Sequence, residues 1–333
     1  MKIRVIVAGF LVAAIAAPAQ AQCPTAAADA CQKAADLLNY MTPQLSTALA
    51  SGNPTLGQGG ALGGLGHFSI DIRASAVNGS SPNVSNLSLS TSGRQSTTFT
   101  NQNQFIPAAS VDAGIGLWRG YSLGVTHVGG LDAIVTMTYL PNISSKSNGG
   151  NGNGGLSTGD LTVNGSNEKF GFGFRLGLLE ESAVTPGVSF AWVKRDLPTV
   201  SFTANVDSTS AINRGGELAL NNFSVNTTAW RVTAAKSFLI FGLSAGVGQD
   251  KYDASSTINV TVNGPFGGTG SQAGSLSMTR TNMFVGAFVN LFIFKLEGEY
   301  GQVSGGSAAT FNTFNPVASA SRSYFTLGLR FGR

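Results

Sequence analysis

The segment from Lys169 to Glu180, KFGFGFRLGLLE, carries a large apolar residue at every second position. Successive side chains of a β-strand point to opposite faces, so this spacing builds one apolar face and one face of glycine and charge. The apolar face consists of Phe170, Phe172, Phe174, Leu176 and Leu178. In a soluble sandwich such a face would cover a protein core, whereas in a membrane barrel it would contact lipid.

The N-terminus indicates export. Lys2 and Arg4 precede an apolar run over residues 5–17, and Ala19-Gln20-Ala21 follows as a small-x-small cleavage site. We therefore predict a secretory signal peptide over residues 1–21 and a mature chain that begins at Gln22. The alternative, a membrane anchor, is disfavoured because about 20 apolar residues are needed to span a bilayer.

The composition favours a membrane barrel over a soluble domain. Charged residues make up 11% of the chain, against about 25% in soluble domains. Mean hydropathy is only +0.14, and no run of 18 apolar residues follows the signal peptide, so strands that alternate apolar with polar residues explain the pattern better than a spanning helix. Removing Lys2 and Arg4 lowers the net charge from +4 to +2. With no basic cluster, we expect no nucleic acid partner.

Three regions follow the signal peptide. Residues 22–51 have helical periodicity, and Thr42-Pro43 reads as a cap followed by proline, which predicts two short helices. Residues 52–66, GNPTLGQGGALGGLG, form a glycine-rich connector. From His67 to Arg333 the apolar period is two, which predicts a transmembrane β-barrel.

We identify ten strand-like segments in this third region: 68–76, 111–117, 131–139, 169–180, 188–192, 222–237, 239–253, 277–291, 292–304 and 321–331. The connections after the first, third, fifth, seventh and ninth are long and polar, whereas the others are short. This asymmetry is typical of outer-membrane barrels, and an even strand number puts both chain ends at the short-turn, periplasmic side. The predicted fold is all-β, a closed antiparallel transmembrane β-barrel of about ten strands, with twelve as the alternative, and a short N-terminal helical segment.

The pattern resembles the Gram-negative outer-membrane β-barrel class over about 265 residues, which implies outer-membrane lipid as its surroundings. Thr326, Gly328 and Phe331 in the last strand resemble the polar-x-Gly-x-x-aromatic signal that the barrel-assembly machinery reads, although Gly332-Arg333 follows them. A second resemblance is to FadL-type transporters of hydrophobic molecules. It is based on a hatch-like N-terminal segment, on Gly52-Asn53-Pro54 in the connector and on a glycine-rich approach to the barrel. It implies a small hydrophobic ligand.

Nine charged residues fall on the small, polar faces of the predicted strands and are expected to face the lumen: Asp71, Arg73, Asp112, Asp132, Arg175, Lys295, Glu297, Glu299 and Arg330. Buried charges must be paired, whereas a selectivity lining usually has one dominant sign. The mixed signs favour structural ion pairs.

The remaining reactive residues point to no catalytic chemistry. Cys23 and Cys31 can form a disulfide in an oxidising compartment, but a continuous helix would hold them about 12 Å apart, so Cys23 must fold back from outside the helix that contains Cys31. His67 and Ser69 share one strand face, yet residues two apart on a strand lie almost 7 Å apart. We therefore predict neither an enzyme nor a metal or cofactor site.

Two functions remain open. The first is passive transport of small hydrophobic molecules through a narrow lumen that residues 22–51 plug; these residues could instead cap the periplasmic mouth. The second is a structural or surface-interaction barrel with a closed lumen, which acts through its long extracellular loops.

Overall fold

The computed structural model describes residues 23–84, 87–140, 160–206 and 215–332, so the predicted signal peptide lies outside the described residues. The first elements of the described part are η1 (Thr25–Ala27) and α1 (Ala28–Ala50). No helix in these described ranges is long and apolar enough to cross a membrane. The strands are β1 (Phe68–Pro82), β2 (Thr98–Phe99), β3 (Asn101–Trp118), β4 (Tyr121–Ser122), β5 (His127–Val128), β6 (Gly130–Tyr139), β7 (Asp160–Val163), β8 (Glu168–Leu179), β9 (Gly187–Asp196), β10 (Val200–Val206), β11 (Gly216–Phe238), β12 (Phe241–Val262), β13 (Gly268–Leu291), β14 (Phe294–Ser304), β15 (Thr313–Phe314) and β16 (Arg322–Gly332).

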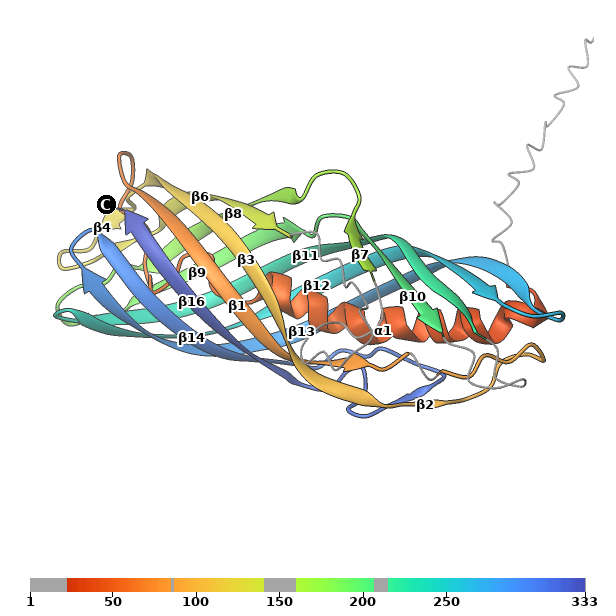
Figure 1. Ribbon diagram of the computed structural model, residues 1–333. Coiled ribbons are helices and arrows are strands. Elements are labelled where there is room, and N and C mark those ends of the chain that lie inside the picture. Colours follow the sequence, from red (N-terminus) through yellow and green to blue (C-terminus); the bar gives the residue numbers. More distant parts are fainter. Residues whose placement is uncertain (1–22, 85–86, 141–159, 207–214, 333) are drawn as a thin grey trace, which may run out of the picture.

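Ten of these described strands close into an antiparallel barrel (Figure 1). The order around the ring is β1-β3-β6-β8-β9-β11-β12-β13-β14-β16, and β16 pairs with β1 to complete it. β10 pairs with the far part of β11 and β7 pairs with β10, which extends the sheet to twelve strands beside the ring. The predicted all-β fold with about ten barrel strands is confirmed.

The two ends of the barrel differ. At the short-turn end, residues 239–240 and 292–293 connect their strands directly, and β1 begins and β16 ends there. The opposite, long-loop end carries the connections 83–100 and 305–321. In Figure 1 the C-terminus marks the short-turn end on the left.

One predicted long loop is instead a β-hairpin. The connection after the seventh predicted strand was expected to be long, but β12 and β13 continue beyond the ring to a turn over residues 263–267. Ser255, Thr257 and Asn259 made this segment look like a loop. They alternate with Ile258, Val260 and other buried apolar residues that pack in the core around α1, and this burial extends the strands.

The polarity of the barrel is inverted relative to a soluble sandwich. Phe170, Phe172 and Phe174 of β8 lie exposed on the outer face, whereas Arg175 is buried on the inner face. The same alternation recurs in β12, where Leu243 and Val247 are exposed and Ser244 is buried. The outer wall is therefore apolar and the lumen wall is small, polar and charged.

α1 lies inside this wall, along the barrel axis in the long-loop half (Figure 1). Seventeen of its 23 residues are buried. The prediction of two short helices is wrong, because α1 continues through Pro43. Proline supplies no N–H to the preceding turn, but strands pack around the helix on both sides of this point. The hydroxyls of Thr42 and Thr47 also donate to the carbonyls of Leu38 and Pro43, both at 2.7 Å.

The direction of α1 corrects a second prediction. Ala26 and Ala27, at its start, pack beside Gly268 and Gly270 of β13 at the long-loop end. The connector 52–66 then passes through the lumen to the short-turn end, where β1 begins. The end of β16 lies at the short-turn end as predicted, but Cys23, the first described residue, lies at the opposite end, since the chain crosses the lumen before its first strand.

Candidate functional site: the plugged lumen

We call α1 together with the connector 52–66 the plug, because it occupies the barrel interior from one end to the other. Towards the short-turn end, charged side chains of the wall hold the plug by binding its backbone carbonyls and amides. Towards the long-loop end, the plug is held by apolar packing and by polar side chains of α1. These two regions, together with the cavity at the short-turn end, define the site.

Three arginines of the wall converge on the carbonyls at and just after the end of α1, and we call Arg73, Arg195 and Arg231 the arginine clamp. Arg231 donates to the carbonyls of Ala50 at 2.7 Å and Gly52 at 2.9 Å. Arg73 donates to those of Ser51 at 2.8 Å and Gly52 at 2.9 Å, and Arg195 to that of Ala50 at 3.2 Å. The final carbonyls of a helix have no partner within the helix and carry partial negative charge, so cations at this end are stabilising.

The clamp is itself held by carboxylates. Arg73 pairs with Asp112 at 2.6 Å and Arg231 with Asp250 at 3.1 Å, and all four side chains are buried. Removing one partner of such a buried pair lowers the stability of the protein by several kcal/mol, because the other charge is left unpaired. The wall therefore fixes the end of α1 near the middle of the lumen.

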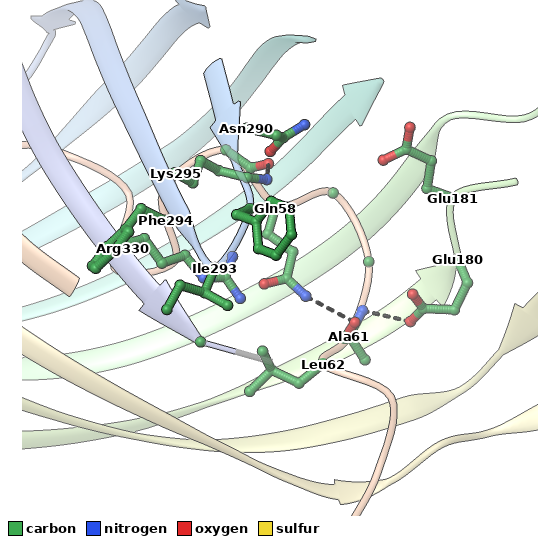
Figure 2. A pocket seen from close by; sticks show the side chains of 15 residues that line it. Gln58, Ala61, Leu62, Glu180, Glu181, Asn290, Ile293, Phe294, Lys295 and Arg330 are labelled. Atoms are coloured by element: carbon green, nitrogen blue, oxygen red, sulfur yellow. Dashed lines mark hydrogen bonds between the residues drawn. The ribbon is translucent and has the colours of Figure 1, made fainter. Parts of the chain in front are cut away.

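The connector is bound by the next layer of charges towards the short-turn end. Asp132 accepts from the amide of Leu62 at 3.0 Å while it pairs with Arg175 at 2.7 Å. Lys295 donates to the carbonyl of Gly57 at 2.7 Å. Glu180 accepts from the amide of Ala61 (Figure 2). These charges therefore serve both the wall and the plug.

Two glycines show how tightly the connector fits. A Cβ atom on Gly116 of β3 would lie 2.3 Å from the carbonyl oxygen of Gly64, and one on Gly59 would lie 2.3 Å from that of Gly187. Real Cβ atoms do not approach backbone oxygen this closely. At these levels the plug and the wall are in backbone contact.

The structure places all nine predicted lumen charges on the inner face or at its short-turn rim. Arg73–Asp112 and Arg175–Asp132 form close pairs, and Arg330 lies 3.8 Å from Asp71. Glu299 accepts from Tyr324 and from the amide of Asn53, and Glu297 accepts from Ser244. The lumen charges therefore form ion pairs with one another and hydrogen bonds with the plug.

Sequence reasoning missed Arg195, Arg231 and Asp250. Arg195 stands in the run Lys194-Arg195-Asp196, where charge on three successive positions hides the alternation. A signal was present, since Arg195 is in phase with Ser189, and Arg231 directly follows the apolar Trp230 of the outer face. Extending the alternation to the end of β9 and through the middle of β11 would have found both arginines.

The other predicted site residues take separate positions. Cys23 and Cys31 are joined in a disulfide with Cα atoms 6.4 Å apart, packed on Gly270 at the long-loop end. Thr326 is buried and its hydroxyl lies 2.8 Å from that of Ser75; Phe331 faces outward beside Phe294. In the described ranges, no cluster of three histidine, cysteine, aspartate or glutamate residues could hold a metal ion.

Polar side chains of α1 bind the loops at the long-loop end. We call residues 87–100 and 305–321 of these loops the outer cap. Asp29 accepts from the amides of Ser90 and Gln95, both at 2.8 Å, and Lys33 donates to the carbonyl of Ser88 at 2.6 Å. From the other loop, the amide of Asn312 donates to Asp36 at 2.7 Å.

Aromatic packing completes the outer cap. Tyr40 of α1 stacks on Phe314 with 4.3 Å between ring centroids, and Phe314 stacks on Phe99 at 4.6 Å. Phe99 and Phe314 belong to β2 and β15, which pair in parallel. The plug and the outer cap therefore share one hydrophobic core.

A cavity of about 300 Å³ opens at the short-turn end between the connector and the turns of the wall (Figure 2). Lys295, Arg330, Glu180 and Glu181 line it together with the apolar turn 292–294. Burial raises the pKa of Glu180, which lies in the turn after β8, above its ordinary value, while the Ala61 amide and Arg175 oppose that shift.

Comparison with known proteins gives only distant likenesses. No protein-family model and no curated protein matches the chain. Among solved structures, the toluene transporter TodX of Pseudomonas putida is 12% identical with a TM-score of 0.32, covering 80% of this chain and 88% of TodX. The attachment invasion locus protein Ail of Yersinia pestis is 11% identical with a TM-score of 0.28 (81% and 99% covered). The transport unit of the Escherichia coli autotransporter AIDA-I is 10% identical with a TM-score of 0.30 (89% and 98%). Likenesses this low carry no functional inference.

Proposed function

We propose that the protein is an outer-membrane β-barrel that its own plug closes at rest, and that it acts at the cell surface through its outer cap. The apolar outer wall and the closed ring support residence in a bilayer, since a closed barrel leaves no backbone polar group exposed to lipid. Short turns on one side and long loops on the other support a periplasmic short-turn end.

The observation that carries the surface role is the bonding between α1 and the outer cap. Asp29, Lys33 and Asp36 form hydrogen bonds with the backbone and side chains of the outer cap. Tyr40 stacks on an aromatic ring of the same cap. A segment that only blocked a pore would have no need to shape the loops. This arrangement suits a rigid surface scaffold.

Gated passage of small hydrophobic molecules is the second candidate. The cavity at the short-turn end and the polar bonds of the connector favour it, because hydrogen bonds to carbonyls can be exchanged for water when a plug moves. Passage would require the arginine clamp to release the end of α1.

Planar-bilayer recordings on three forms of the mature protein separate these candidates. The first is the unchanged chain. The second is R231Q/D250N, which removes one buried pair of the clamp without changing net charge. The third is the matched control K251Q/D253N, which removes the pair Lys251–Asp253, 3.2 Å apart and exposed on β12.

The surface role predicts silence from all three forms, together with a lower unfolding temperature for R231Q/D250N only. Discrete openings confined to R231Q/D250N would favour gated passage. Steady current from the unchanged protein would contradict closure at rest and with it the proposal.

A further inference from the structure

Two hairpin turns at the short-turn end have unusual residues at their tips. The turns are Phe238-Leu239-Ile240-Phe241 and Leu291-Phe292-Ile293-Phe294, so four large apolar residues follow one another in each. Leu239 and Phe292 adopt positive φ, 58° and 62°. This conformation is sterically costly for bulky side chains, and two-residue hairpins normally place glycine or asparagine there.

Neither tip is covered by the rest of the chain. Leu239 is 97% exposed and Phe292 is fully exposed. A water-facing turn would gain nothing from such residues, whereas a turn in an apolar medium would gain the transfer of both side chains. We propose that these two turns lie in the lipid of the membrane leaflet on the short-turn side and anchor the barrel there, an inference that rests on the membrane residence proposed above.

The length of the apolar wall supports lipid as the occupant. A tilted transmembrane strand needs about 9–11 residues. On β12 the outward apolar residues run only from Phe241 to Val247, a span of seven residues, before Gln249. On β14 they run from Phe294 to Tyr300, again seven, before Gln302. Adding the two residues of each turn brings both spans to nine.

The distribution of exposed apolar residues supports the same occupant. At the short-turn end, each connection around the ring carries one: Leu65 before β1, Leu123 after β3, Val184 after β8, and the residues of the two turns. A partner protein would bind one side of this rim, whereas lipid surrounds it. Trp118 and Tyr121, in edge-to-face contact at 4.8 Å, are exposed beside the turn after β3, and these residue types concentrate at membrane interfaces.

Spin labels at single introduced cysteines test this placement, because Cys23 and Cys31 are already joined. The variants are L239C and F292C, with L243C on the outer wall as the lipid reference and T269C at the exposed long-loop end as the water reference. Each full-length mature protein is reconstituted in vesicles of phosphatidylethanolamine and phosphatidylglycerol. Power saturation then compares collisions with oxygen, which dissolves in lipid, and with a water-soluble nickel chelate.

Labels at 239 and 292 are expected to match L243C, with an oxygen-to-nickel ratio several-fold above that of T269C. A ratio equal to that of T269C, with L243C still lipid-like, would overturn the anchoring of the turns and leave the membrane barrel standing. If L243C itself matched T269C, the proposed membrane residence would fail first. Labels at 239 and 292 shielded from both reagents would overturn lipid in favour of a protein contact.

Discussion

At the scale of single residues, alternation along the strands predicted which charges face the lumen but not what they hold. Asp132 was expected to pair with a basic residue, and Arg175 is that partner. That Asp132 also binds the amide of Leu62 depends on the path of a connector whose glycines carry no periodicity. Arg195 and Arg231 were missed because the alternation was not followed through their positions, and their bonds to the carbonyls of Ala50 and Gly52 leave no pattern in the sequence.

The contact between Gly116 and the connector gives a residue-scale prediction. G116A places a methyl group where the carbonyl of Gly64 lies, and because both partners are backbone, the strain cannot be relieved by a rotamer change. We expect a loss of about 1–3 kcal/mol in the free energy of unfolding, measured by denaturant titration in detergent. The control is G298A on the outer wall, where the nearest atoms lie 3.8 Å away. Equal stability of G116A and G298A would contradict the threaded connector.

Glu180 gives a pH prediction. Its pKa is raised in the folded protein by burial, so the contribution of Glu180 to stability is fully present below its unfolded pKa of about 4.5 and is lost as pH rises through the folded pKa. E180Q keeps an oxygen that can accept from the Ala61 amide but carries no charge. We expect the unfolding free energy of E180Q to fall less than that of the unchanged protein between about pH 4 and about pH 8. Parallel pH profiles of the two proteins would argue against a half-buried carboxylate here.

At the scale of elements, period-two alternation located all ten barrel strands, because it reports a wall with two different faces. It failed where the environment changes along a strand. The outer parts of β12 and β13 leave the apolar wall and pack on α1, so their exposed positions carry Ser, Thr and Asn, which resemble loop residues. Likewise Pro43 predicted a helix end, yet packing inside the barrel outweighs the lost hydrogen bond.

The role of α1 as a scaffold for the outer cap is an element-scale prediction. Asp36 accepts from the amide of Asn312 and from its side chain, both at 2.7 Å. D36A removes both bonds and leaves buried donors unpaired, which costs about 1–3 kcal/mol for each group. We expect residues 305–321 to be cleaved faster by protease in reconstituted vesicles, while the barrel strands stay protected. Q32A, which removes an α1 side chain that bonds to Asp36 rather than to the cap, serves as the comparison; equal cleavage of both variants would count against the scaffold.

At the scale of the whole molecule, the predicted signal peptide, the loop asymmetry and the low charge together predicted a closed barrel, but the direction of the plug could not be predicted. It depends on contacts between the start of α1 and the β12–β13 hairpin, more than 200 residues later in the chain.

This direction predicts the topology of the N-terminus. An epitope inserted between Gln22 and Cys23 should bind antibody on intact cells, because Cys23 lies at the long-loop end, which we place outside the cell. An epitope in the turn 180–186 should bind only after the outer membrane is permeabilised. Detection of the N-terminal epitope only after permeabilisation would show that the plug does not cross the lumen.

We propose that the plug, and not the barrel wall, closes the lumen. Single-channel conductance of the mature protein against a form that lacks residues 22–63 tests it most directly, with β-sheet circular dichroism confirming that both forms are folded. We predict a silent full-length protein and a steady current after the deletion, because small inward residues such as Gly177 and Gly328, which now face Ala61 and Leu56, would then face an empty lumen. A folded deletion form that remains silent would contradict the claim.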